Sequence, residues 1–439
     1  MSKMSKMMMP VVWGLAAGAV FAGPVIRDQS VTMWQDATRR VQIEFTLENE
    51  PAIVTVDICT NGVSIGGENL RYMSGDVHKM VKPGDRRVTW QARKAWPGHA
   101  IADGVTAVVT AWPTNSPPDY MAISLVNQGL VEYYATAGEF PQDITNDVYK
   151  TDYLVMRKIP AGGVRWRMGS PGDEYGRSTS GSENARLVTL SRDFYMGIYP
   201  VTQRQYELFF IGQDISIRRP SYFNNEDDYR TRPVERVPYE QLRGAAASGH
   251  DWPSDGHAVV STGFLGKLRA FTGIDSFDLP VEAEWEFACR AGTGGALYSG
   301  VANITWTTLS DPNLNLLARY RYNGGYHGND SEPVGYIGKP ASYCGTSKVG
   351  SHQPNAFGLY DMLGNVQEHC LDWYQSDLSE IDPDLGPASG TSRVSRGGGW
   401  GSGSTACRSA ARSLSNPTSL DGYYNATGFR VTCDTLVHQ

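Results

Sequence analysis

Between residues 28 and 116 the sequence alternates apolar and polar side chains, and this constrains the fold of that part more than any other feature. Successive side chains on a β-strand point to opposite faces, so the alternation predicts strands that are buried on one face. Turn sequences such as NG and KPGD separate the stretches. We therefore predict an antiparallel, immunoglobulin-like β-sandwich over residues 24–116. Its strands would be RRVQIEFTLE, AIVTVDIC, RRVTWQA and GVTAVVTAW.

The pattern changes after a proline-rich connection, WPTNSPPDY. DYMAISL and DYLVMRKIPAG are typical of strands, whereas YPVTQRQYELFFIG and LPVEAEWEFACRAG have the spacing of helices. The second helix carries Glu282, Glu284 and Glu286 early and Arg290 late. Acid–base chemistry is one interpretation of these carboxylates, but we expect a solvated helix start that the helix dipole favours. Short strands and long loops fill the last third, so we predict an α+β fold with extensive ordered loops.

Length and charge narrow the functional classes. A chain of 439 residues exceeds one ordinary core, so two or three domains are expected. The formal net charge is −7 and no basic tract is present, which argues against nucleic acid as a partner.

The first residues are typical of an export signal. Lys3 and Lys6 precede the apolar run VVWGLAAGAVFA, which ends in small residues at Ala22. This run is too short to span a bilayer, and no later run is long enough to form a transmembrane segment. We predict a signal peptide over residues 1–22 and a protein that is secreted, periplasmic or at the cell surface. Export permits disulfides. The six cysteines form no C-x-x-C pair, so we do not expect a structural zinc site.

Seven motifs in a fixed order carry a resemblance to a known family. They are MGIYPVTQRQYELF, RPVERVPYEQ, LPVEAEWEFACRAGT, NAFGLYDMLGNVQEH, RVSRGGGW, CRSAARS and GFRV. Together they resemble the sulfatase-modifying-factor domain, the fold of the formylglycine-generating enzyme, which is related to C-type lectins. The motifs lie between Tyr120 and Cys433, and we assign the domain to residues 120–437. This fold hosts both enzymes and binding proteins, so the site residues must decide between them.

The resemblance implies a copper site that this sequence lacks in part. In the enzyme, two cysteines at the second and seventh positions after a Gly-Gly-Ser-aromatic motif hold Cu(I) between soft thiolates. Counted from Trp400, these positions are Ser402 and Cys407, and a serine hydroxyl cannot replace a thiolate. Gly399 replaces the serine just before the aromatic residue of the family motif, and Gln367 and His369 replace the two tryptophans of a second family motif. The loop is also three residues shorter than in the enzyme, so we predict that copper is not a cofactor.

Two interpretations of Cys407 stay open. A reactive thiol needs a lowered pKa, which the neighbouring Arg408 would favour. An exported protein more often oxidises its cysteines in pairs. The family places Cys370 beside the GGGW loop, and we therefore expect a Cys370–Cys407 disulfide.

The segment DMLGNVQE matches a calcium site of the family. The resemblance implies that Asp361 and Glu368 provide side-chain oxygens and that Gly364 and Val366 provide carbonyl oxygens. Calcium prefers such oxygen ligands on a turning backbone. The alternative is a turn held by its own hydrogen bonds without metal. We predict a structural calcium ion here.

The loop residues between 401 and 427 are rich in Tyr, Ser, Gly and Asn, which make adaptable contact surfaces. Their framework, GGGW and GFRV, is similar to that of lectin-fold variable proteins, although ordinary loop composition is an equal alternative. We predict a non-catalytic module that binds a protein or a glycan. A divergent oxidoreductase acting on a protein cysteine is the second hypothesis, and a subunit assisting an active paralogue is the third. The expected ligand-binding residues are Trp400, Ser402, Ser404, Arg408, Tyr423, Tyr424 and Asn425.

Overall fold

The computed structural model describes residues 23–101, 104–127, 129–224, 228–305, 310–324, 345–418 and 426–436. The predicted signal peptide and three expected ligand-binding residues, Tyr423, Tyr424 and Asn425, lie outside this described part of the chain.

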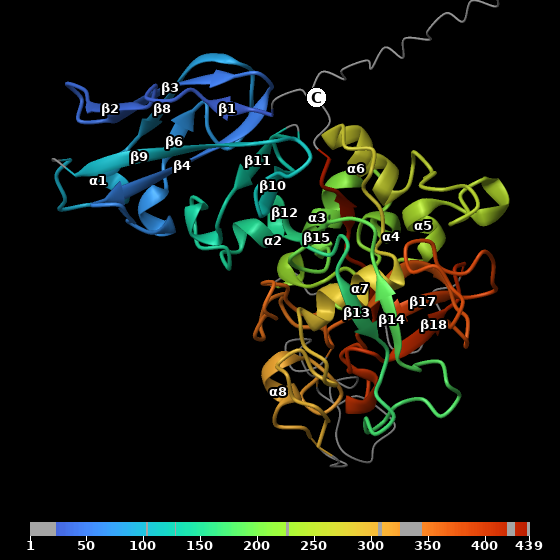
Figure 1. Ribbon diagram of the computed structural model, residues 1–439. Coiled ribbons are helices and arrows are strands. Elements are labelled where there is room, and N and C mark those ends of the chain that lie inside the picture. The colour runs from blue at the N-terminus through green and yellow to red at the C-terminus, as the bar shows by residue number, and fades with distance from the viewer. Residues whose placement is uncertain are drawn as a thin grey trace, which may run out of the picture.

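Two sheets form the N-terminal part and enclose one core (Figure 1). One sheet has the order β1-β3-β8-β6 with β2 paired to β3, and the other has the order β5-β4-β7 with β9 paired to β4. The first contains β1 (Val25–Ile26), β2 (Thr32–Gln35), β3 (Val41–Glu48), β6 (Met73–Gly75) and β8 (Gly84–Trp90). The second contains β4 (Ala52–Thr60), β5 (Val63–Ser64), β7 (Met80–Val81) and β9 (Val105–Trp112).

The alternation in the sequence explains this core. On β3 the apolar side chains of Val41, Ile43 and Phe45 are buried, whereas Gln42 and Glu44 between them are partly exposed. All of the described strand pairs within these two sheets are antiparallel. The four strands predicted from periodicity are therefore confirmed as β3, β4, β8 and β9.

A five-stranded sheet of order β11-β10-β12-β15-β20 begins the C-terminal part. Its strands are β10 (Tyr120–Ser124), β11 (Val131–Tyr134), β12 (Tyr153–Ile159), β15 (Phe194–Gly197) and β20 (Thr432–Asp434). A hairpin of β13 (Arg165–Met168) and β14 (Arg186–Thr189) and a sheet of order β18-β17-β16-β19 complete the strands. That sheet contains β16 (Gln367–Trp373), β17 (Arg393–Arg396), β18 (Arg412–Ser415) and β19 (Thr427–Gly428).

Short helices pack around these sheets (Figure 1). The α-helices are α1 (Ala92–Ala95), α2 (Val148–Thr151), α3 (Gln203–Phe209), α4 (Ile215–Arg218), α5 (Tyr239–Arg243), α6 (Phe264–Thr272), α7 (Glu282–Arg290) and α8 (Leu314–Leu317). The 3₁₀ turns are η1 (Gly67–Leu70), η2 (Ala137–Glu139), η3 (Tyr229–Thr231), η4 (Ala246–Ser248) and η5 (Ser404–Ala406). The two helices predicted from spacing are α3 and α7, and the mixed α+β character of this part is confirmed.

Direct contacts join the two parts. The Tyr133 amide on β11 donates to the His78 carbonyl at 2.8 Å, and the His78 ring shares a 2.9 Å hydrogen bond with the Tyr133 carbonyl. Ile53 of β4 packs into the same apolar cluster as strands β10 and β12. Burial lowers the pKa of His78 to about 4, so this imidazole is neutral at the seam near pH 7.

The solvated start expected for helix α7 is wrong. Glu282, Glu284 and Glu286 are 2%, 6% and 1% exposed. Arginines that are distant in sequence neutralise two of them: Arg396 pairs with both Glu282 and Glu286, and Arg412 pairs with Glu282 at 2.5 Å. The helix therefore lies at the centre of the domain, and its carboxylates fix β17 and β18 to it.

Within the described residues, no helix has the length and apolar content needed to cross a membrane.

Candidate functional site

The candidate site is built on the turn that enters β16 and on the loop that follows β17. The turn runs through Asp361, Gly364 and Asn365, all with positive φ, at 55°, 78° and 63°. The two segments are joined by hydrogen bonds, from the Gly364 amide to the Gly397 carbonyl at 2.8 Å and from the Trp400 amide to the Asn365 carbonyl at 2.9 Å. The sequence motifs DMLGNVQE and GGGW therefore lie side by side.

Asp361 is buried beneath this turn and is only half satisfied. Its Oδ2 accepts a hydrogen bond from the Gly350 amide at 2.6 Å, whereas its Oδ1 has no partner among the described residues. Burial raises the pKa of Asp361 to about 6, and the charge of Glu368 adds to this effect. A buried carboxylate oxygen without a donor is an available ligand for a cation.

Glu368 has its own partners. Its Oε2 accepts from Trp285 Nε1 at 2.7 Å, and its Oε1 pairs with Arg430 Nη2 at 2.8 Å. Arg430 Nε also donates to both oxygens, at 3.3 Å and 3.1 Å, so each carboxylate oxygen already accepts two hydrogen bonds. The predicted calcium ligands are the carboxylates of Asp361 and Glu368 and the carbonyls of Gly364 and Val366. Of the two carboxylates, only Asp361 has an oxygen that accepts no hydrogen bond from a described residue.

The GGGW loop is close-packed along its glycines. Gly397 and Gly398 have φ of 88° and 68°, which glycine adopts most easily. A Cβ at Gly398 would lie 2.7 Å from Cys407 Sγ, and one at Gly399 would lie 2.9 Å from the Ala426 Cβ. The glycines thus let the loop approach Cys407 and β19.

Cys407 is buried, with no exposed surface. Burial raises the pKa of its thiol to about 12, and the opposing effect of Arg408 is smaller. Cys407 and Cys370 lie in the same apolar cluster, yet both are free thiols, so the expected disulfide between them is not formed. The physical reason is their packing: the Cys407 sulfur lies against the Gly398 backbone, and Cys370 Sγ lies 4.0 Å from the Glu368 carbonyl oxygen.

Ser402 takes part in the local turn. Its hydroxyl accepts a hydrogen bond from the Gly399 amide at 3.0 Å, and its carbonyl accepts one from the Arg321 amide at 3.0 Å. Ser404 is half-buried and is the first residue of η5. Its carbonyl accepts a hydrogen bond from the Cys407 amide at 3.0 Å. Both serines are partly exposed, so they can contact a ligand.

Trp400 and Arg408 differ from the expectation that they face a ligand. Each is only 1% exposed. The Trp400 ring packs edge-on against Phe223, with ring centroids 5.0 Å apart. Arg408 pairs with Glu174 at 2.5 Å and with Glu183 at 2.9 Å. These two side chains hold the loop to the rest of the domain.

The residues at the family's two tryptophan positions also have local partners. Gln367 Oε1 accepts a hydrogen bond from Ser395 Oγ at 3.1 Å, and His369 Nε2 shares one with the Val237 carbonyl at 3.0 Å. Burial lowers the pKa of His369 to about 4, so it is neutral at pH 7. Both side chains therefore stabilise the sheet locally.

The structure adds one buried carboxylate that sequence reasoning missed. Glu235 is fully buried, and its Oε1 accepts from the Phe223 amide at 2.9 Å, next to the Trp400 contact. Its Oε2 has no partner in the described structure, and burial raises the pKa of Glu235 to about 8. No local signal identifies it, because its motif, RPVERVPYEQ, looks polar and exposed in sequence.

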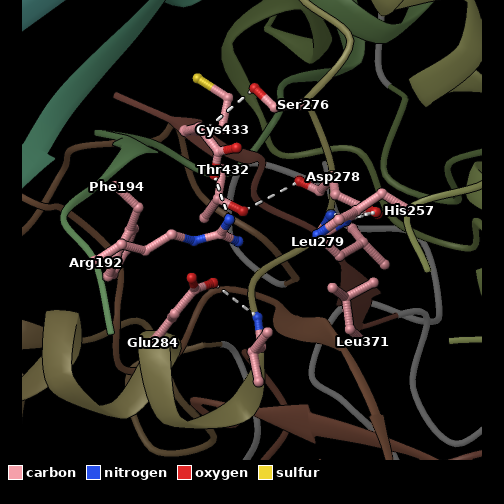
Figure 2. Close-up of a pocket in the computed structure, with 12 residues that line it drawn as sticks. Arg192, Phe194, His257, Ser276, Asp278, Leu279, Glu284, Leu371, Thr432 and Cys433 are labelled. Carbon is pink, nitrogen blue, oxygen red and sulfur yellow. Dashed lines mark hydrogen bonds and ion pairs between the residues drawn. The ribbon is translucent and has the colours of Figure 1, made fainter. Parts of the chain in front are cut away.

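A separate pocket lies between β15, β20 and the start of α7 (Figure 2). Figure 2 shows Arg192 reaching across it towards Thr432, with the Glu284 carboxylate below. Asp278 pairs with Arg243 at 2.7 Å and with His257 at 2.8 Å, and Glu284 accepts from the Val281 amide at 3.0 Å. The cavity of about 10 Å³ has room for about one water molecule, so we assign these polar groups to the core.

Comparison with known proteins places this geometry in a family. The family described as "Sulfatase-modifying factor enzyme 1-like domain" matches residues 145–435. The formylglycine-generating enzyme of Thermomonospora curvata is 36% identical over 171 residues, which are 36% of this chain and 50% of that relative. That of Mus musculus is 33% identical over 304 residues, which are 64% of this chain and 75% of the relative. Chaperone protein LppX of Paenibacillus barcinonensis is 28% identical over 240 residues, covering 51% and 75%.

Two solved structures are similar to about two thirds of the chain. PvdO from Pseudomonas aeruginosa has a TM-score of 0.46 and 23% identity, and covers 64% of this chain and 94% of its own. Treponema denticola variable protein 1 has a TM-score of 0.43 and 25% identity, covering 64% and 95%. The family match extends over more than half of the chain and its range contains all seven motifs. The chain therefore belongs to the sulfatase-modifying factor enzyme 1-like family.

Proposed function

We propose that this member of the family is an exported, non-catalytic binding module whose lectin-like domain binds a protein or a glycan. One observation carries the proposal: the single cysteine at the copper position, Cys407, is buried and its thiol is held protonated. Cu(I) binds the thiolate, and because burial raises the pKa of Cys407 to about 12, forming that thiolate costs more here than in an exposed cysteine.

The remaining residues at that position also do not fit copper. Ser402 supplies a hard oxygen, and its hydroxyl already accepts the Gly399 amide. A soft monovalent copper ion prefers two sulfur ligands, and this loop offers at most one. No step of a copper reaction can therefore be assigned to these side chains.

A divergent oxidase is the second candidate, and the similarity to formylglycine-generating enzymes favours it. The relatives do not share one printed role, however, since one of them is named a chaperone. The loop that follows β17 suits binding without redox chemistry, because its serines Ser402 and Ser404 are partly exposed and its cysteine, Cys407, is buried. The apolar N-terminal segment supports export, and the sheet-rich N-terminal part would act as an immunoglobulin-like spacer.

A structural calcium ion belongs to this proposal. The Asp361 carboxylate has a buried oxygen that lacks a partner among the described residues, whereas the charge of Glu368 is balanced by Arg430. Calcium would neutralise the Asp361 carboxylate and fix the turn on which the GGGW loop rests.

An oxidation assay tests the central proposal. The full chain is incubated with Cu(I), reductant, dioxygen and a Cys-x-Pro-x-Arg peptide, and the peptide mass is followed; an active family enzyme is the positive control. We expect the cysteine to persist, also in Ser402→Cys, because Gly399 and Gln367 still depart from the enzyme's pattern. Steady conversion to formylglycine that Cys407→Ala abolishes would establish the oxidase instead.

A further inference from the structure

Strand β9 (Val105–Trp112) forms a long free edge of the N-terminal part (Figure 1). It pairs with β4 on one side, and no described strand pairs with its other side. The other strands at the edges of the two N-terminal sheets have two to four residues, whereas β9 has eight. Its sequence, VTAVVTAW, contains no charged residue and no proline, which are two common protections of an edge strand against pairing.

The hydrogen bonds of β4 show which of its backbone groups face β9. The Ile58 carbonyl accepts from the Ile65 amide at 2.9 Å, on the β5 side of β4 and away from β9. Backbone groups of successive residues point to alternate sides of a strand, so the neighbouring Asp57 faces β9. Asp57 is paired with Val108, and the amide and carbonyl of Val108 therefore face β4.

The same alternation assigns the rest of β9. Just before the strand, the Gly104 carbonyl accepts from the Asn61 amide at the end of β4 at 2.9 Å, which agrees with even-numbered residues facing β4. The residues between them direct their amides and carbonyls to the free edge. These four edge residues are Val105, Ala107, Val109 and Ala111.

The backbone groups of the edge residues are unpaired and accessible. None of the hydrogen bonds among the described residues involves their amides or carbonyls. The nearby strands β1 and β2 belong to the opposite sheet and pair with β3 instead. The side chains of the edge residues pack against the core of the sandwich, yet all four residues are partly exposed, so another chain can reach them along the edge.

A free edge of this kind accepts a further extended strand, and the pattern of β9 fits a second copy of itself. In an antiparallel pair centred on Val108, Val105 lies opposite Ala111 of the second copy, and Ala107 lies opposite Val109. Each of these pairs joins two edge residues, so every edge amide and carbonyl of both strands finds a partner.

The side chains on the exposed face match in the same register. Val108, which is 48% exposed, meets its own copy, and Thr106 meets Thr110. Such pairs of β-branched side chains favour strand pairing, and the absence of charge on β9 avoids repulsion. A shift by one residue would place edge groups opposite groups that face β4. A shift by two residues would place Val105 opposite Pro113, which has no amide hydrogen.

We propose that two copies of this chain associate through β9, so that one sheet continues across a two-fold axis at Val108. The interface lies in the N-terminal part and uses no residue of the GGGW loop. It therefore does not rest on the proposed function, and the oxidation assay is independent of it.

Sedimentation equilibrium of the full chain tests the association. We expect a reversible monomer–dimer equilibrium below about 1 mM, the weak end of specific association. Val108→Lys places two like charges opposite each other at the axis and should weaken the dimer about fivefold to tenfold. Val63→Lys, at an exposed site on β5, is the matched control and should change nothing.

Opposite charges test the register without relying on loss of function. Val108→Glu should weaken self-association as Val108→Lys does, whereas an equimolar mixture of the two variants should form a heterodimer. A chain that stays monomeric throughout this range, a dimer that Val108→Lys leaves unchanged, or variants that fold but do not pair when mixed would each overturn the proposal.

Amide hydrogen exchange measured by NMR identifies what covers the edge. In dilute protein the amides of the edge residues should exchange rapidly, and they should become protected as the concentration rises. The Val108 amide faces β4 and should be protected at every concentration. Edge protection that does not depend on concentration would show that another segment of the same chain covers β9. That result would contradict pairing between two copies.

Discussion

Arg408 gives the sharpest stability prediction, because the structure makes it the anchor of the loop that the sequence assigns to ligand binding. Its guanidinium pairs with the buried carboxylates of Glu174 and Glu183, at 2.5 Å and 2.9 Å. Removing one partner of a buried ion pair leaves uncompensated charge and costs about 3–5 kcal/mol. A domain of this size loses about 2–4 °C of melting temperature per kcal/mol, so Arg408→Met should melt about 6–20 °C lower.

Differential scanning calorimetry measures this loss, and two further variants identify its cause. Adding Glu174→Gln and Glu183→Gln to Arg408→Met removes the stranded charges and should restore at least half of the lost stability. Arg165→Met, at an exposed site on β13, is the matched control and should change stability by less than about 0.5 kcal/mol. A loss below about 1 kcal/mol for Arg408→Met, or no recovery in the triple variant, would refute the anchoring role.

Three further predictions concern the site itself. Calcium at about a hundred times its Kd should stabilise the intact chain by about 2.7 kcal/mol in thermal unfolding, and Asp361→Ala should lose this gain; equal melting in calcium and chelator would remove the site. Burial raises the pKa of Glu235 from 4.5 to about 8, so the folded chain keeps a proton that the unfolded chain releases. The free energy of unfolding therefore falls as the pH rises between these two values. Urea unfolding should show Glu235→Gln more stable than the intact chain at pH 9 by several kcal/mol, on the order of 5, and the reverse order would contradict the burial. Cys407 should resist iodoacetamide at pH 8 until the protein unfolds, and rapid alkylation of the native protein, mapped by mass spectrometry, would show an accessible thiol.

Local patterns predicted the elements well, because their causes are local. The alternation of Val41, Ile43 and Phe45 is visible in the sequence and places β3 on a core in the structure. Helix α7 was likewise predictable from its spacing, with Glu282 at its start and Arg290 at its end.

Burial of polar residues was not predictable, because it depends on partners that are distant in sequence. Glu282 looks solvated until Arg396 and Arg412, more than a hundred residues away, are brought beside it. Arg408 looks available to a ligand until Glu174 and Glu183 are placed around it. In both cases the side chain's charge suggests exposure, whereas the fold supplies the opposite charge inside the domain.

The cysteines show the same limit. The family motifs suggested that Cys370 and Cys407 lie close enough to pair, but the structure shows only that both are buried in the large core of the domain. Whether two nearby sulfurs meet depends on the direction of each Cβ, which motif order does not carry. The structure leaves both as free thiols.

Cu(I) binding separates a non-catalytic binding module from a copper oxidase. The intact chain and Cys407→Ala are titrated against a chromogenic Cu(I) chelator under anaerobic, reducing conditions. Because the Cys407 thiol is buried with a raised pKa and Ser402 gives no second sulfur, we expect that neither protein removes copper from the chelator. One equivalent of Cu(I) bound tightly by the intact chain and lost in Cys407→Ala would contradict it.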